Sequence, residues 1–154
     1  MMRSVILLVL FPVAVFAQQA VVDENYVRGC FSQELAGSNL PECVGDAAST
    51  CQSAPGNDTT IGIALCIQAE TTVWDALLNE QYNLRRPELT EESAELANQL
   101  RDAQRAWINF RDAECGLQYS LRLGGSIRTI IAANCVLAET AERALELRDL
   151  GKME

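Results

Sequence analysis

Apolar residues recur at intervals of three and four along most of this chain, which is the spacing of one face of an α-helix. The longest series lie at residues 61–85, from 90 to 122, and at 126–150, and shorter ones lie at 24–36 and 40–52. No segment alternates apolar and polar residues between hairpin turns, so we expect no β-sheet. The pattern predicts an all-α fold: an antiparallel bundle of three long helices with two short N-terminal helices across one end.

Turn-forming residues divide these helices. The Ser-Ala-Pro-Gly-Asn-Asp stretch at 53–58 predicts a loop, with Thr59 or Thr60 capping the helix that follows. Pro87 is expected to interrupt the third helix, because proline lacks the backbone N–H that a helix interior needs. A Gly-Gly pair then separates the fourth helix from a fifth one capped by Ser126. Short connections of this kind predict that successive long helices are antiparallel neighbours.

The first 17 residues have the form of a secretory signal peptide. Arg3 precedes an apolar stretch at 5–16, and Val15-Phe16-Ala17 fits a cleavage site. About 12 apolar residues are fewer than the roughly 20 that a membrane-spanning helix needs. We therefore expect export, cleavage before Gln18, no membrane insertion afterwards, and a periplasmic or secreted protein.

Charge and composition limit the classes of partner and cofactor that this chain can have. The 154-residue chain carries 12 basic and 21 acidic residues, a net charge of −9, and loss of Arg3 with the leader leaves −10. Such a charge argues against nucleic acid and anionic membranes as partners, and it fits either a basic partner or simply a highly soluble protein. The chain has no histidine and no C-x-x-C pair, which argues against metal sites and thiol redox chemistry. We expect no cofactor.

The cysteines form an even set of six, as in a disulfide-linked exported domain. Cys115 and Cys135 lie nine and ten residues on either side of the Gly-Gly pair, so an antiparallel hairpin brings them to the same height. Cys51 and Cys66 flank the turn at 53–58 in the same way. Six cysteines allow fifteen pairings; we expect Cys115–Cys135 and Cys51–Cys66, which leaves Cys30–Cys43.

Polar residues are patterned more densely than packing requires in the third and fourth helices. If the turn lies near Pro87, Glu70 faces Gln104 and Arg105, and by a similar count Arg111 faces Glu139. Trp107 and Arg111, four residues apart, are expected to form a cation–π pair. We interpret these residues mainly as contacts that fix helix register. A catalytic carboxylate pair built from Glu70, Asp75 or Asp112 is disfavoured, because a small bundle offers no deep cleft, and we expect no enzymatic activity.

Two runs in these helices resemble one known family. They read Ala69-Glu70-x3-Trp74-Asp75-x2-Leu78-Asn79-x2-Tyr82 and Ala103-Gln104-Arg105-Ala106-Trp107-x2-Phe110-Arg111-Asp112-x2-Cys115. Together with Cys135-x4-Thr140-x2-Arg143-x3-Leu147, they resemble the LprI-type lysozyme inhibitor domain family over residues 61–150. Residues 18–60 then form an N-terminal helical elaboration that carries Cys30, Cys43 and Cys51.

The resemblance implies a small, exported, helical, disulfide-linked envelope protein whose namesake activity is inhibition of lysozyme. The matching positions are mainly a structural signature: Glu70, Trp74, Asp75, Asn79, Tyr82, Gln104, Arg105, Trp107, Arg111 and Asp112. Many lysozymes are strongly basic, and an acidic protein is steered towards them. Candidate contacts are the loop residues Asn57 and Asp58 and the acidic residues Glu88, Glu91 and Glu92. The alternative is a structural or assembly protein of the envelope that uses the same surface without inhibiting.

Overall fold

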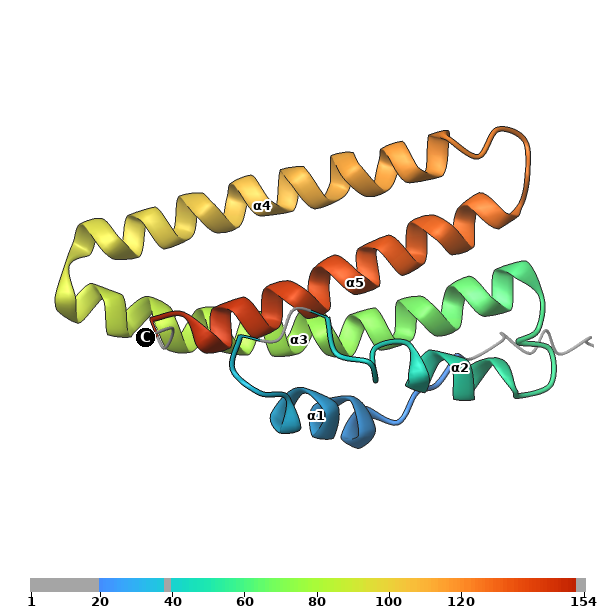
Figure 1. Ribbon diagram of the computed structural model, residues 1–154, viewed down its shortest axis with the longest axis horizontal. Coiled ribbons are helices and arrows are strands. Elements are labelled where there is room, and N and C mark those ends of the chain that lie inside the picture. Colours follow the sequence, from blue (N-terminus) through green and yellow to red (C-terminus); the bar gives the residue numbers. More distant parts are fainter. Residues whose placement is uncertain (1–19, 38–39, 152–154) are drawn as a thin grey trace, which may run out of the picture.

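The structure is a computed structural model that describes residues 20–37 and 40–151, so the expected signal peptide at 1–17 lies outside the described residues. Within these ranges the chain forms five helices and no strand: α1 (Glu24–Gln33), α2 (Asp46–Gln52), α3 (Thr60–Glu92), α4 (Ala94–Ser120) and α5 (Ile127–Asp149). Figure 1 shows α3, α4 and α5 as three long helices with α1 and α2 on the outer side of α3. The predicted all-α bundle is confirmed.

The third helix is longer than expected, because α3 passes through Pro87 and ends only at Glu92. Pro87 lies on the exposed side of the helix, so the carbonyl of Asn83, which loses its helical partner, is open to solvent. Leu89, one turn from the end, packs against the core, and its carbonyl accepts a hydrogen bond from Ser93 N (2.8 Å). Ser93 is extended, and its hydroxyl accepts from Glu95 N to begin α4. The prediction of a turn near Pro87 is wrong; the turn is at Ser93.

The second helix is shorter than expected and begins at Asp46 instead of residue 40. Gly45, the residue before it, has φ +98°, a conformation that glycine adopts without steric strain. Cys43 therefore lies in the turn ahead of α2 and not within the helix.

The core is centred on the contact between α3 and α5. Trp74 and Leu78 of α3 are almost fully buried with Leu145 of α5, and Ala141 and Ala144 let the two helices approach closely. Figure 1 shows α5 between the other two long helices, with α4 diverging from α3 away from their shared turn. Of α4, the side chains of Ala97, Leu100, Gln104 and Cys115 are buried. Beyond its first half, α4 is thus attached to the bundle mainly through α5.

All six cysteines are paired, in the same pairs that were expected. The disulfides are Cys30–Cys43, Cys51–Cys66 and Cys115–Cys135, with Cα–Cα distances of 6.2, 5.7 and 5.5 Å. They connect α1 to the turn before α2, α2 to α3, and α4 to α5. The two N-terminal helices are therefore joined covalently to the long-helix bundle at Cys66.

The N-terminal segment shares one core with the long helices. Phe31 of α1 meets the Trp74 ring edge-on, with centroids 6.1 Å apart and an interplanar angle of 72°. Arg148, near the end of α5, donates to the carbonyls of Phe31 (2.7 Å) and Leu35 (3.2 Å). The same guanidinium donates two hydrogen bonds to the carboxylate of Asp149 (both 2.8 Å). These contacts fasten the end of α1 to the end of α5.

The length and mean hydropathy of α3 would also suit a membrane-spanning helix, and α3 is the one such helix in the described ranges. A core helix of a water-soluble bundle meets the same criteria. Because one face of α3 packs against α5, α1 and α2, its apolar character is accounted for by the core.

Candidate partner-binding surfaces

The carboxylate of Glu70 is fully buried, with the residue 0% exposed. Its Oε1 accepts hydrogen bonds from Gly45 N (2.8 Å) and Trp74 Nε1 (3.2 Å), and its Oε2 accepts from Ala48 N (2.7 Å). Gly45 has no side chain with which to cap α2, so a carboxylate from α3 satisfies the first N–H groups of that helix. The expectation that Glu70 faces Gln104 and Arg105 is wrong: its partners come from the N-terminal segment.

A second cluster links α4 to α5. Arg143 Nε donates to Gln104 Oε1 (3.0 Å), and the Trp107 ring has the Arg111 guanidinium 5.0 Å and the Arg143 guanidinium 6.0 Å from its centroid. The expected cation–π pair between Trp107 and Arg111 is confirmed. The cluster holds α4 against the middle of α5 and leaves the Trp107 side chain half-buried.

The remaining motif residues make local contacts. Arg111 pairs with its neighbour Asp112 (2.8 Å), so the expected pair with Glu139 is wrong. Asp75 accepts a hydrogen bond from Asn79 one turn along α3 (3.0 Å). Tyr82 packs half-buried against the core, and Arg105 is exposed. Nothing in this set brings two carboxylates together around an open cleft.

The loop before α3 differs from the expected binding loop. Asn57 is only 4% exposed, and its amide donates to the Cys51 carbonyl (3.0 Å), so the expectation that it is exposed is wrong. A Cβ added to Gly62 would lie 2.6 Å from the Asn57 Cα, which shows how closely the loop lies against α3. Asp58 does reach solvent.

Acidic side chains concentrate at the turn between α3 and α4. The carboxylates of Glu88, Glu91, Glu92 and Glu95 are all exposed. Glu88 pairs with Arg85 (2.7 Å), but in the described ranges Glu91 and Glu92 form no ion pair. We call residues 88–95 the acidic turn. It presents four carboxylates to solvent, of which Glu91 and Glu92 have no ion-pair partner in the described ranges.

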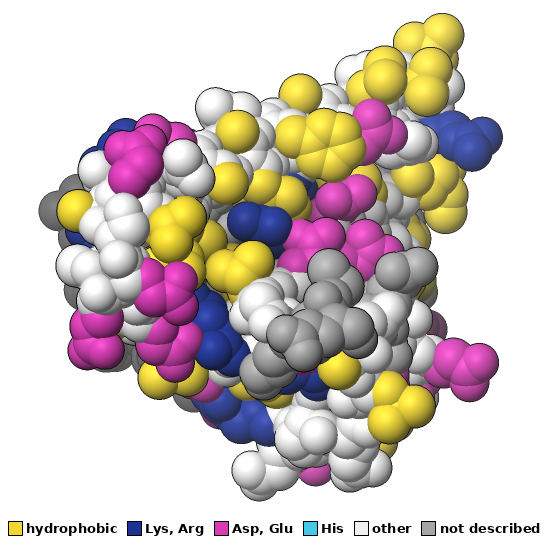
Figure 2. Space-filling model, turned by 60° about the vertical axis from the view of Figure 1, so that its left-hand side comes forward, with side chains coloured by type: hydrophobic (Ala, Val, Ile, Leu, Met, Phe, Trp, Pro, Cys, Tyr) yellow, Lys and Arg dark blue, Asp and Glu magenta, His cyan; other side chains and the backbone are white. Residues whose placement is uncertain are grey.

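A second acidic group, which sequence reasoning missed, lies on α5. Glu139, Glu142 and Glu146 lie three and four residues apart, so they share one side of the helix. Burial raises the pKa of Glu142 above its ordinary value, and repulsion from Glu139 and Glu146 adds to this effect. The spacing of these three glutamates is visible in the sequence, but the count from the glycine turn assigns Glu139 to Arg111 instead. Figure 2 shows acidic side chains in the centre and on the left of one face.

The raised pKa predicts a pH-dependent gain from Glu142→Gln. A carboxyl group whose pKa is higher in the folded than in the unfolded chain destabilises the fold once it ionises. That destabilisation is absent below the ordinary glutamate pKa of 4.5 and develops as the pH rises through the raised value. Glu142→Gln should therefore raise the thermal unfolding midpoint at neutral pH and have little effect in acid.

The matched control is Glu146→Gln, which changes the charge equally but removes an ion pair with Arg143 (2.7 Å). It should give no stabilisation at neutral pH. Calorimetry across the pH range measures the unfolding midpoint of each variant. An equal rise of the midpoint in both variants would contradict the assignment of the destabilising charge to Glu142.

Comparison with known proteins identifies the family to which this chain belongs. Residues 51–147 match the family described as lysozyme inhibitor LprI. An uncharacterized protein of Rhizobium meliloti (strain 1021) is 30% identical over 96 residues, which cover 56% of this chain and 69% of that protein. No solved structure matches the chain significantly. Since the match covers more than half of the chain and includes α3, α4 and nearly all of α5, this protein belongs to the LprI lysozyme inhibitor family.

Proposed function

We propose that this protein is an exported binding protein that inhibits a basic lysozyme, and that the acidic turn carries the interaction. The family is one of inhibitors and not of enzymes. The observation that supports the site is the exposed, unpaired charge of Glu91 and Glu92 at the end of α3. A cationic partner gains electrostatic attraction there without breaking an existing ion pair.

Three features support this assignment. The three disulfides suit an oxidising compartment outside the cytoplasm, where lysozyme acts. Ser93 and the two long helices hold the acidic turn on a rigid support, which lowers the entropy lost on binding. The neighbouring carboxylates of Glu139, Glu142 and Glu146 extend the negative potential along α5.

The test is charge reversal at the acidic turn. Glu91→Lys/Glu92→Lys should raise the concentration needed to inhibit a basic lysozyme on cell-wall suspensions by about tenfold or more. Lysine is favoured in the last turn of a helix, so α3 should remain folded. Inhibition by the unaltered protein should also weaken as ionic strength rises.

The matched control is Glu42→Lys/Asp75→Lys, which changes net charge equally at exposed positions elsewhere. A third variant, Asp58→Lys, tests the loop before α3. If control and test variants lose inhibition equally, net charge and not the acidic turn determines binding. If the unaltered protein inhibits no basic lysozyme at molar excess, inhibition is rejected and the role as an envelope assembly protein takes its place.

A further inference from the structure

The end of the molecule where α4 meets α5 has the opposite character to the acidic turn. Residues 115–138 contain no Asp or Glu, although they include two arginines, in a chain with 21 acidic residues. Residues 59–69, which begin α3 at the same end, carry no charge. Asp58 is the acidic residue next to this region. The net charge by itself argues against an anionic membrane as partner, but the charge is unevenly distributed, and this end of the bundle carries almost none of the acidic residues.

Large apolar side chains protrude at this end. Leu123 is 93% exposed, and Leu121, Ile127 and Leu117 are 63%, 53% and 52% exposed. Together with Arg122 and Arg128 they form what we call the apolar tip. In Figure 2 the protruding end at the upper right carries hydrophobic and basic side chains. Contiguous exposed apolar surface of this kind marks an interaction site more often than chance exposure.

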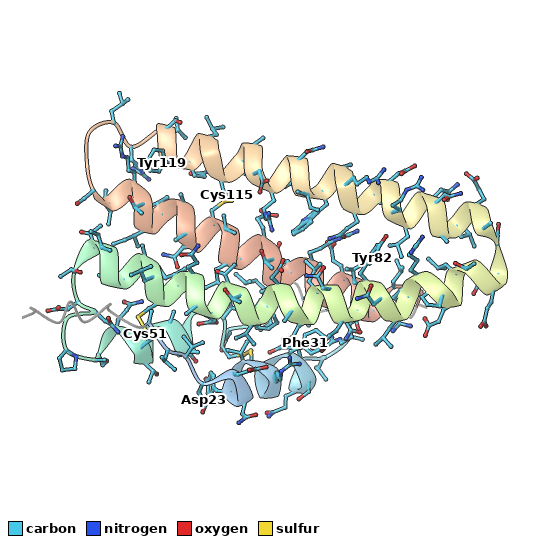
Figure 3. The ribbon with its side chains drawn as sticks, turned by 180° about the vertical axis from the view of Figure 1, so that it is seen from behind. Asp23, Phe31, Cys51, Tyr82, Cys115 and Tyr119 are labelled. Carbon is cyan, nitrogen blue, oxygen red and sulfur yellow. A yellow bond between two sulfur atoms is a disulfide. The ribbon has the colours of Figure 1, made fainter. Side chains whose placement is uncertain are left out.

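The fold itself does not use these side chains. Between residues 105 and 120, Cys115 is the buried residue of α4. Figure 3 shows Cys115 between α4 and α5, with Tyr119 further towards the tip. The end of α4 and the turn to α5 form a hairpin closed by the Cys115–Cys135 disulfide, and α3 begins beside this turn, where Thr60 Oγ1 donates to Ser126 Oγ (3.4 Å). Figure 2 shows this end of the molecule as a projection, whereas a surface that receives a peptide or a helix is usually a groove.

The two arginines are available to an anionic partner. Arg128 stacks on the Tyr119 ring at 4.5 Å, which orients its guanidinium, and Arg122 is exposed. Neither forms an ion pair within the described ranges. In the sequence, the acidic residues that flank this region are Glu114, eight residues before Arg122, and Glu139, eleven residues after Arg128. Asp58, in the loop before α3, is exposed at the same end and forms no ion pair with either arginine in the described ranges.

We propose that the apolar tip docks on the surface of an anionic phospholipid bilayer. The leucine and isoleucine side chains enter the boundary between headgroups and acyl chains, and the arginines bind the lipid phosphates. A bilayer fits a convex apolar tip because lipids deform around it, and the absence of acidic residues at 115–138 fits its negative charge. This is docking at the interface and not a membrane span. The acidic turn, at the other end of α4, then points away from the bilayer.

The test is binding of the processed chain, starting at Gln18, to vesicles of phosphatidylglycerol and phosphatidylcholine, compared with phosphatidylcholine alone. The apolar leader is omitted because it would bind vesicles by itself. We expect cosedimentation with the anionic vesicles. Leu121→Ser/Leu123→Ser should lower the partition coefficient at least about tenfold, and Arg122→Gln about fivefold. The matched control Leu84→Ser, at a 57% exposed leucine of α3, should bind as the unaltered protein does.

Equal binding to both kinds of vesicle, or equal losses for Leu84→Ser and the tip variants, would overturn the proposal. So would self-association that the tip variants abolish in the absence of vesicle binding, because the tip would then contact a second copy of the chain. The tip variants should inhibit lysozyme in solution as the unaltered protein does. Failure of vesicle binding and failure of inhibition are therefore separate results.

Discussion

Replacing Glu70 with alanine is expected to lower the free energy of unfolding by about 4 kcal/mol. The substitution removes the acceptor of three hydrogen bonds, from Gly45 N, Ala48 N and Trp74 Nε1, and leaves these donors without a partner. It also opens a cavity where the side chain is 0% exposed. A domain of this size has roughly 5–15 kcal/mol of stability in total, so the effect approaches complete unfolding.

Urea unfolding of the oxidised protein, followed by circular dichroism, measures this loss. Glu80→Ala is the matched control, because Glu80 lies on the same helix and pairs with Arg28 at the surface (2.9 Å). It should cost about 1 kcal/mol or less. Glu70→Gln should fall between the two, since the amide retains one oxygen acceptor but places an NH2 group against a backbone N–H. Similar losses for Glu70→Ala and Glu80→Ala would contradict the role of Glu70 as the cap of α2.

Removing the Cys115–Cys135 disulfide is expected to loosen one end of the molecule without unfolding the rest. A disulfide that closes a loop of this size contributes about 3 kcal/mol. The second half of α4 buries little besides Cys115, so few contacts remain to replace the bond. In Cys115→Ala/Cys135→Ala, amide hydrogens of residues 110–126 should exchange faster by about two orders of magnitude. Those in the middle of α3 should keep their protection.

Hydrogen exchange with mass spectrometry distinguishes the two regions. The comparison variant is Cys51→Ala/Cys66→Ala, whose disulfide lies in the core between α2 and α3. Its removal should lower protection in α2 and α3. If loss of Cys115–Cys135 instead lowered protection evenly over the whole bundle, the hairpin would belong to the same cooperative unit as the core.

Counting residues from a turn succeeded where the turn was placed correctly. Cys115 and Cys135 meet because the Gly-Gly pair does lie in the turn between α4 and α5. From that turn the two helices keep their register. The same count failed for Glu70, because the chain turns at Ser93, six residues after Pro87. Each residue of error in a turn shifts the opposing position by two. Gln104 therefore does not lie opposite Glu70 along the helix axis. In addition, Glu70 lies on the side of α3 that faces α2.

The position of that turn depended on packing and not on local preference. Proline disfavours a helix interior by about 3 kcal/mol. Here Pro87 is on the surface, Leu89 beyond it reaches the core, and Ser93 caps α4. Arg85 adds hydrogen bonds to the carbonyls of Leu147 (3.1 Å) and Arg148 (2.7 Å) at the end of α5. None of these compensating contacts is visible in a local reading of the sequence.

The helical class, the three long and two short helices and the three cysteine pairs all follow from the pattern of residues along the chain. Periodicity and spacing along a helix are local properties, so they can be recognised without knowledge of the fold. The contacts of Glu70, the burial of Asn57 and the exposure of Leu123 follow only from the packed structure. Those features depend on which segments distant in sequence pack together, and packing is a property of the whole chain.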